Sequence, residues 1–242
     1  MPRKELKEWI PPKETYLFKI QGQLLCLMTS LFTFILMKIL NKTTIYGQDI
    51  IDREKGPYIF ASNHISMFDS GFIDGMVFYK KNLQGYDYAP YHTPEYNNFY
   101  RNFLLSYYMD HVKCIPLTRG KGIDQPAQKV VNEKLLNGGI VHIFPEGTRS
   151  RSGELLPAKG GVGKRIYETK VKVIPCYHEG MRGILPIGKY IPRIGNRVKI
   201  SIGEPIYFDD LFAKDNVPDT WREIANRIME HIKMLKDDLK EK

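Results

Sequence analysis

Two short blocks carry the side chains that could do chemistry in this 242-residue chain. The first is Asn63-His64-Ile65-Ser66-Met67-Phe68-Asp69, and the second, some eighty residues later, is Phe144-Pro145-Glu146-Gly147-Thr148-Arg149-Ser150. An imidazole with a carboxylate partner can take a proton from an alcohol, and a guanidinium in a tight loop can hold an anion. Together the two blocks suggest acyl transfer to a hydroxyl on an anionic acceptor.

The histidine of the first block follows a predicted strand, 58–61, where functional loops of α/β sheets lie. Asp69 is expected in the first turn of the next helix, where its carboxylate can hold one nitrogen of His64 and leave the other to accept a proton. Ser66 lies between them, but no Gly-x-Ser-x-Gly elbow surrounds it, so we interpret it as a helix cap. For His64 alone, a buried histidine with satisfied hydrogen bonds is the alternative.

The second block follows another predicted strand, 140–144, and supplies a carboxylate, a flexible turn, a hydroxyl and a guanidinium, from Glu146, Gly147, Thr148 and Arg149. With help from Arg151 and Lys159, the guanidinium of Arg149 can bind a phosphate, because a guanidinium donates two parallel hydrogen bonds. We expect Glu146 to pair with Arg149 or to bind an acceptor hydroxyl. A charged surface turn is the alternative, which the nearby base and carboxylate disfavour.

The amino-acid composition limits the classes of binding partner but does not identify one. The formal net charge of +9 favours an anionic partner: nucleic acid, a phospholipid surface or a phosphorylated metabolite. The three cysteines have no metal-like spacing, and no Cys-x-x-Cys or His-Glu-x-x-His motif occurs, so we assign no metal. The stretch 158–165 superficially resembles a P-loop but lacks its first glycine and its Ser/Thr, so nucleotide hydrolysis is rejected.

The stretch 20–37 has no formal charge and is nearly all apolar. As a helix it would be about 27 Å long, just short of a typical hydrocarbon core, so it is either a marginal span or a helix in one leaflet. A buried core helix is the alternative. A cleaved signal peptide is disfavoured because a polar lead of 19 residues precedes the stretch. Flanking lysines and aromatic residues favour an anchor.

After residue 42 the pattern changes to short apolar runs that alternate with helical stretches. Runs at 171–176 and 198–203 are further strand candidates, and a helix with Asp219 as its cap is expected near the end of the chain. We therefore predict an α/β fold with a mixed, mostly parallel sheet flanked by helices. Residues 1–42 are expected to form a membrane-anchoring helical segment and residues 43–242 one catalytic domain.

Both blocks, in this order and at this separation, resemble the glycerophospholipid acyltransferases related to 1-acylglycerol-3-phosphate acyltransferase. In that family an Asn-His-x4-Asp block carries the base, which matches His64 and Asp69, and a Phe-Pro-Glu-Gly-Thr-Arg-Ser block binds the glycerol phosphate. The resemblance implies a substrate-binding set of Asn63, Arg119, Glu146, Gly147, Thr148 and Arg149. It implies no bound cofactor, with an acyl-coenzyme A or acyl carrier protein thioester as the acyl donor and a lysophosphatidate or related lysophospholipid as the acceptor.

Other residues are similar to the tafazzin subfamily, among them Lys113-Cys114-Ile115-Pro116 and His178-Glu179-Gly180-Met181. That resemblance implies an alternative, a transacylase that moves acyl chains between phospholipids without coenzyme A. A basic membrane- or nucleic-acid-binding protein without catalysis is the alternative of another class, but no nucleic-acid-binding motif is present. The enzyme would work at a membrane, with its catalytic domain on the cytoplasmic side in a bacterium, or at a mitochondrial membrane in a true tafazzin. The oligomeric state stays open.

Overall fold

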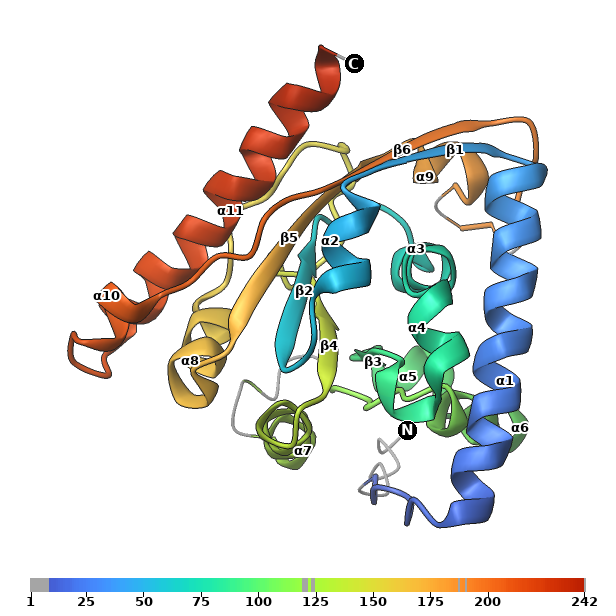
Figure 1. Cartoon of the computed structure of the whole chain (residues 1–242), viewed down its shortest axis with the longest axis horizontal. Helices are drawn as coiled ribbons and strands as arrows, with labels where there is room; N and C mark the ends of the chain where they lie inside the picture. Colours follow the sequence, from blue (N-terminus) through green and yellow to red (C-terminus); the bar gives the residue numbers. More distant parts are fainter. Residues whose placement is uncertain (1–8, 119–121, 123–124, 187, 190, 242) are drawn as a thin grey trace, which may run out of the picture.

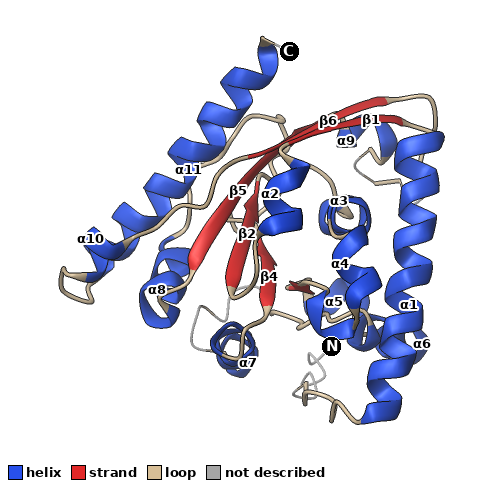
Figure 2. Cartoon of the chain, viewed as in Figure 1, coloured by secondary structure: helices blue, strands red, loops and turns tan. Residues whose placement is uncertain are grey.

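A single six-stranded sheet organises the chain in the computed structural model, which describes residues 9–118, 122, 125–186, 188–189 and 191–241 (Figures 1 and 2). The strand order is β1-β6-β5-β2-β4-β3. Only the β5–β6 pair is antiparallel within the described residues, so the predicted mixed, mostly parallel sheet is confirmed. The strands are β1 Lys42–Tyr46, β2 Tyr58–Ser62, β3 Tyr91–His92, β4 Ile140–Ile143, β5 Lys172–Glu179 and β6 Arg197–Ile202.

The central strands are buried on both faces, and their side chains alternate between two cores. Along β2, Ile59 and Ala61 belong to one core, whereas Tyr58 and Phe60 belong to the other. The register places Phe60 beside His142 of β4 and Ile174 of β5, so neighbouring strands present the same face at the same level. Two helical layers are therefore required, one on each side of the sheet.

The first layer consists of α7, α8 and α11, whose apolar residues pack with Ile59 and Val141 in one core. Figure 1 shows α11 running along one side of the sheet, with α8 and α7 beneath it. The second layer includes α2, α3 and α9, and its core contains Phe60, Ile73 and Met181. The longer helices of the two layers are α2 Gln48–Arg53, α3 Asp69–Val77, α7 Pro126–Leu136, α8 Gly160–Thr169 and α11 Pro218–Lys240, and the short one is α9 Met181–Ile184.

The last helix differs from its prediction at its start. Helix α11 begins at Pro218, its N-cap residue is Val217, and no side chain caps it. Asp219 therefore lies inside the first turn and is not the cap. A carboxylate at this place still interacts favourably with the helix dipole. The remaining elements are α4 Tyr79–Gln84, η2 Tyr86–Tyr88, α5 Tyr96–Phe99, α6 Phe103–His111 and α10 Asp209–Phe212.

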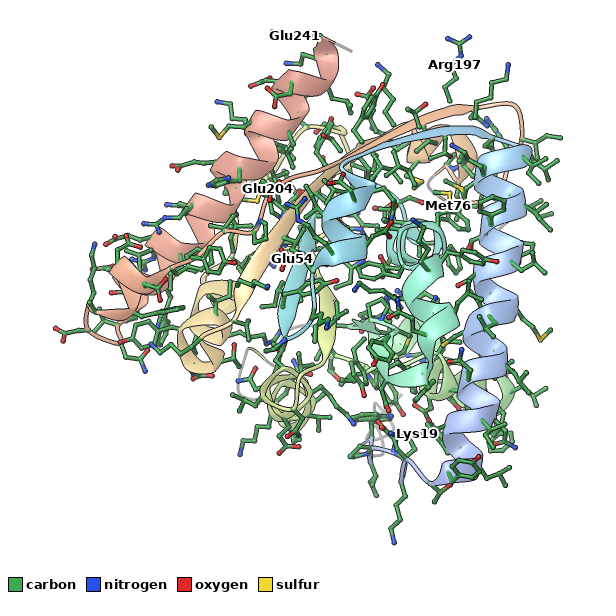
Figure 3. All side chains as sticks on the ribbon, in the orientation of Figure 1. Lys19, Glu54, Met76, Arg197, Glu204 and Glu241 are labelled. Carbon is green, nitrogen blue, oxygen red and sulfur yellow. The ribbon has the colours of Figure 1, made fainter. Side chains whose placement is uncertain are left out.

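The N-terminal helix α1, Tyr16–Phe34, continues into a π-helical turn, η1, Ile35–Ile39. It buries small or polar residues, Gly22, Cys26, Ser30 and Thr33, against the rest of the protein. Large apolar side chains on its other side are exposed: Leu17, Leu24, Met28, Leu31 and Ile35. Figure 3 shows side chains projecting outward from this side, with Lys19 in the first turns. The helix is thus inverted relative to a helix of a soluble protein, which buries its apolar face.

Tyr16–Ile39 is long and apolar enough to cross a membrane, with a mean hydropathy of 1.7 over its most apolar window and 33% of that window buried. The core helix of a soluble protein and a signal sequence can have the same length and composition. The inverted burial argues against a core helix. The division of the chain at residue 42 stays a prediction, because α1 packs closely on α3: a Cβ at Gly75 would lie 1.8 Å from Oγ1 of Thr33.

Candidate active site

The structure brings His64 and Asp69 together at the carboxyl end of β2. His64 lies in the loop after this strand, and Asp69 is the first residue of α3. The Nδ1 atom of His64 lies 2.9 Å from Oδ2 of Asp69. Among the described residues, no hydrogen bond engages the other ring nitrogen, Nε2, and His64 lines the main cavity. The pair therefore has the arrangement of a base and its orienting carboxylate.

The carboxylate of Asp69 is fully buried and also holds the loop. Its Oδ2 accepts the backbone amides of Ile65 at 2.7 Å and Ser66 at 2.8 Å. Burial on its own raises the pKa of this carboxyl, but interactions with His178 and His64 and the Ser66 amide outweigh burial and lower the pKa below its ordinary value. We therefore treat Asp69 as ionised at neutral pH.

Ser66 does not cap the helix, contrary to the prediction. The N-cap residue of α3 is Phe68, and no side chain caps it. The hydroxyl of Ser66 donates to the carbonyl of Leu185 at 3.3 Å instead. Asp69 instead accepts the backbone amides of Ile65 and Ser66 in the loop that precedes the helix, and no side chain takes over the capping role predicted for Ser66.

The second block lies directly against the first. The ring of Phe144 stacks on His64, with centroids 3.9 Å apart and planes 12° apart. The amide of Ser150 donates to the carbonyl of His64 at 2.8 Å. The first contact holds the face of the imidazole and the second holds the main chain of His64. Together they favour a single orientation of the ring.

Glu146 is buried, and backbone amides occupy both of its oxygens. Oε1 accepts from the amide of His64 and Oε2 from the amide of Leu156, each at 3.1 Å. Burial raises the pKa of this carboxyl to about 7. Among the described residues, no ion pair joins Glu146 to Arg149, which was one of its two expected partners, and both of its oxygens accept backbone amides. Substrate binding by Glu146 stays a prediction, and its observed contacts are with the backbone.

The side-chain amide of Asn63 likewise forms hydrogen bonds with the protein backbone. Its Nδ2 donates to the carbonyl of His178 at 3.0 Å, and its Oδ1 accepts the amide of His178 at 2.9 Å. The imidazole of His178 also lies 2.8 Å from the carbonyl of Asn63. This reciprocal pairing ties the end of β2 to β5, behind the base, and substrate contact by Asn63 stays a prediction.

Gly147, Thr148 and Arg149 line the cavity, as His64 does. Gly147 has a φ of 61°, and a Cβ there would lie 2.8 Å from Cδ of Lys159, so both its conformation and its surroundings favour glycine. Lys159 also lines the cavity. No described carboxylate forms an ion pair with Arg149 or Lys159, so two cationic side chains remain available to an anion beside the base.

Arg165 of α8 adds a third cation that sequence reasoning missed. It lines the same cavity, is 8% exposed, and donates from Nε to Oδ1 of Asn132 at 2.9 Å. Burial lowers its pKa to about 10, so it is still charged at neutral pH. No motif marks this residue, and only the helical spacing of α8 places it on the cavity wall. Arg119, another predicted ligand, lies outside the described residues.

The cavity has a volume of about 800 Å³ and extends from the two blocks to α1 and α6. Its apolar part is lined by side chains such as Phe68, Phe72, Phe99 and Met109. Helix α1 contributes residues including Cys26, Thr29 and Thr33. The cavity therefore combines cationic side chains from the Gly147 loop and α8 with a larger apolar lining. This polarity suits a molecule with an anionic head and a hydrocarbon chain.

Comparisons with known proteins show which family and which relatives the chain resembles. Residues 42–179 match the model of the acyltransferase family. The chain is 30% identical over 227 residues to tafazzin of Drosophila melanogaster, covering 88% of this chain and 60% of that protein. It is 28% identical over 170 residues to a chloroplastic 1-acyl-sn-glycerol-3-phosphate acyltransferase of Brassica napus, covering 69% of this chain and 45% of that protein.

A solved structure has a similar fold. The crystal structure of the 1-acyl-sn-glycerophosphate acyltransferase PlsC from Thermotoga maritima superposes with a TM-score of 0.59 and 21% sequence identity, covering 88% of this chain and 79% of that one. The chain spans about 60% and 45% of the two curated relatives named above.

Proposed function

Because the chain belongs to the acyltransferase family, we propose that it transfers a fatty acyl group to the hydroxyl of a lysophosphatidate or related lysophospholipid. The observation that carries this proposal is that His64, oriented by Asp69, lines the same cavity as Arg149 and Lys159. A base and an anion site side by side match an acceptor that carries a hydroxyl and a phosphate.

The base acts on the acceptor. Nε2 of His64 takes the proton as the acceptor oxygen attacks the carbonyl carbon of the acyl donor, while Asp69 holds Nδ1–H and stabilises the imidazolium. The new ester C–O bond forms, the bond from the carbonyl carbon to the leaving group breaks, and the imidazolium returns its proton to that group. No covalent acyl-enzyme is needed, because positioning of an activated ester or thioester can supply a large part of the rate.

The acceptor phosphate binds at the cationic side chains of the cavity. Arg149 is suited to two parallel hydrogen bonds with phosphate oxygens, and Lys159 adds a point charge. Arg165, buried on the wall, contributes long-range attraction. Arg119 remains a candidate for the same phosphate from the family resemblance. In this proposal Asn63 and Glu146 are positioning residues, since their side chains hold the backbone of the base.

The apolar lining of the cavity takes hydrocarbon, and α1 holds the enzyme at the bilayer where its substrates lie. Exposed leucine and methionine side chains on α1 and neighbouring lysines favour an anionic lipid surface. We therefore place the enzyme at a membrane, on the cytoplasmic side in a bacterium or at a mitochondrial membrane if the chain is a true tafazzin.

Two candidate functions differ in the acyl donor that the enzyme would use. The lysophosphatidate enzymes that the second block resembles would use an acyl-coenzyme A or acyl carrier protein thioester. Similarity to tafazzin along 88% of the chain supports the second candidate, a transacylase with a phospholipid donor. Both use the same base and the same acceptor hydroxyl.

One assay tests the base and the donor together. The purified full chain is incubated with lysophosphatidate and, in separate reactions, acyl-coenzyme A, acyl carrier protein thioester or diacyl phospholipid, and products are quantified by mass spectrometry. We expect phosphatidate with one donor class and its loss in His64→Ala, whereas His231→Ala on α11 keeps the activity. Near-normal transfer by His64→Ala would overturn the mechanism, and no transfer with any donor would favour the non-catalytic alternative.

A further inference from the structure

A second cluster of chemistry-bearing side chains lies in the cavity, apart from the His64–Asp69 pair. It consists of Asp74, His92 and His142, whose ligand atoms all lie within 4.8 Å of one another. We propose that these three residues bind a divalent transition-metal ion such as Zn²⁺, with an open coordination position toward the cavity. The proposed acyl transfer does not use them, so this inference stands apart from it.

The sheet register explains why the two histidines meet. In the parallel β3–β4 pair, His92 lies directly beside His142, so both side chains leave the same face of the sheet. Their neighbours Tyr91 and Val141 point to the opposite core. Helix α3 covers the face with the histidines and carries Asp74 above them. Three segments that are far apart in the sequence therefore contribute one proposed metal ligand each.

The distances are close to those of a metal centre. Nδ1 of His142 lies 2.9 Å from both oxygens of Asp74, and Nδ1 of His92 lies 3.1 Å from Oδ2. Around a tetrahedral zinc ion with bonds of about 2.0–2.1 Å, ligand atoms lie about 3.3 Å apart. The Asp74–histidine separations differ from this value by a few tenths of an ångström, and all three ligand atoms lie within 4.8 Å of one another. Two imidazoles and one carboxylate are a recurrent ligand set for zinc and ferrous iron.

One of the three proposed ligand atoms has no hydrogen-bond partner among the described residues. Nδ1 of His92 is buried and has no hydrogen-bond partner among the described residues, although it lies close to Asp74. A buried ring nitrogen without a partner is costly, and a metal ion would satisfy it. No described Lys or Arg pairs with Asp74, whose ion-pair partners are the two histidines. An ion with two positive charges would compensate this carboxylate.

Outer contacts hold the ring of His142 as they do in metal sites. Its Nε2 lies 2.8 Å from Oγ of Ser62, which leaves Nδ1 for the ion. Phe60 meets the ring edge to face at 5.0 Å, and Phe144 lies 4.8 Å away. Phe144 also stacks on His64, so one phenyl ring lies against both the proposed base and the proposed metal ligand.

The same distances match a Ser-His-Asp triad of Ser62, His142 and Asp74, but burial excludes that function. Ser62 is fully buried in β2 and does not line the cavity, so its hydroxyl cannot attack a substrate. Asp74, His92 and His142 do line the cavity. An ion could therefore enter from the cavity and accept a water, a carboxylate or a phosphate as a further ligand.

Metal titration tests the site directly. Tag-free protein is stripped with a chelator and titrated with Co²⁺, a coloured substitute for Zn²⁺, and Zn²⁺ binding is measured by calorimetry. We expect one ion per chain, visible absorption bands typical of low-coordinate cobalt, and loss of these bands when Zn²⁺ is added. The absence of saturable binding by either ion would overturn the proposal.

Variants assign the ligands. His92→Gln and Asp74→Asn should each weaken binding by more than about 100-fold, since loss of an outer partner already costs about 10- to 100-fold. His92 lies in a two-residue edge strand and is partly exposed, so His92→Gln is the variant expected to fold even if Asp74→Asn does not. His231→Ala and His64→Ala should bind normally. Binding that survives His92→Gln, or that disappears in His64→Ala, would contradict the assignment.

Discussion

The side chain of Glu146 accepts the backbone amide of His64 at 3.1 Å, across 82 residues of sequence. The Ser150 amide adds a second link by donating to the carbonyl of His64 at 2.8 Å. The loop that carries the proposed base and the loop that carries the proposed phosphate ligands are therefore joined by one side-chain-to-main-chain and one main-chain-to-main-chain hydrogen bond. We infer that the spacing between base and phosphate site depends on this junction.

The junction should make stability depend on pH through Glu146. Its carboxyl has a pKa of about 7 in the folded protein because it is buried, against an ordinary 4.5. A raised pKa means that its stabilising effect is complete below pH 4.5 and is lost as the pH rises through 7. The loss amounts to about 3 kcal/mol. Glu146→Gln should therefore gain about 2 to 3 kcal/mol relative to wild type between pH 5 and pH 8 in urea unfolding.

The matched control is Glu133→Gln on the exposed side of α7, which should leave the pH dependence unchanged. A constant difference between Glu146→Gln and wild type at the two pH values would show that Glu146 ionises normally. Since neutral Gln, like the protonated carboxyl, offers one carbonyl oxygen as a strong acceptor, the variant is expected to be about as stable as wild type at pH 5 and more stable at pH 8.

A second prediction concerns the orienting carboxylate. In Asp69→Asn one oxygen can still accept from Ile65, Ser66 and His64, but the charge that stabilises the imidazolium is lost. We expect kcat to fall by about 10²- to 10⁴-fold with a smaller change in KM. Because the two residues act as one unit, the double variant with His64→Ala should be no slower than His64→Ala alone. Additive losses in this double-mutant cycle would mean that Asp69 acts independently of His64.

The sequence predicted the central architecture well because its strands are short apolar runs with clear ends. Strand β2 extends one residue beyond the expected 58–61, and α3 begins at Asp69, which places that carboxylate in the first turn as expected. The two sequence blocks also predicted that His64 and the Gly147 loop would lie together, and both line one cavity. These features depend on local pattern and on the rule that loops gather at the carboxyl ends of strands.

Contacts that depend on register could not be predicted. Strand β3 has only two residues, and no local periodicity reveals that His92 pairs with His142. The buried cation Arg165 has no motif either. Glu146 was expected near substrate, but which backbone amides donate to its carboxylate depends on the fold of loops far apart in sequence. Non-local pairing, rather than propensity, decides such contacts.

Helix α3 offers a matched pair of glycines for testing how α1 packs. At Gly75 a Cβ would lie 1.8 Å from Oγ1 and 2.8 Å from Cβ of Thr33, whereas at Gly71 nothing lies within 4 Å. Gly71→Ala should stabilise the protein by up to about 1 kcal/mol, since alanine favours a helix. Gly75→Ala should destabilise it by about 1 to 3 kcal/mol through overpacking. Chemical unfolding of both variants measures this, and equal effects would mean that α1 does not rest tightly on α3.

The inverted helix α1 gives the last prediction. Leu24 and Leu31 are 58% and 55% exposed and lie seven residues apart, on one face of the helix. A charged side chain costs about 2.5 to 3.5 kcal/mol at the centre of a membrane helix and less near its surface. The double variant Leu24→Glu/Leu31→Glu should therefore bind anionic phospholipid vesicles at least about 10-fold more weakly in flotation assays, with an unchanged melting temperature. Met234→Glu, at an equally exposed residue of α11, is the matched control. Vesicle binding that survives the double variant would mean that the exposed face of α1 does not contact lipid, and that another surface brings the enzyme to its substrates.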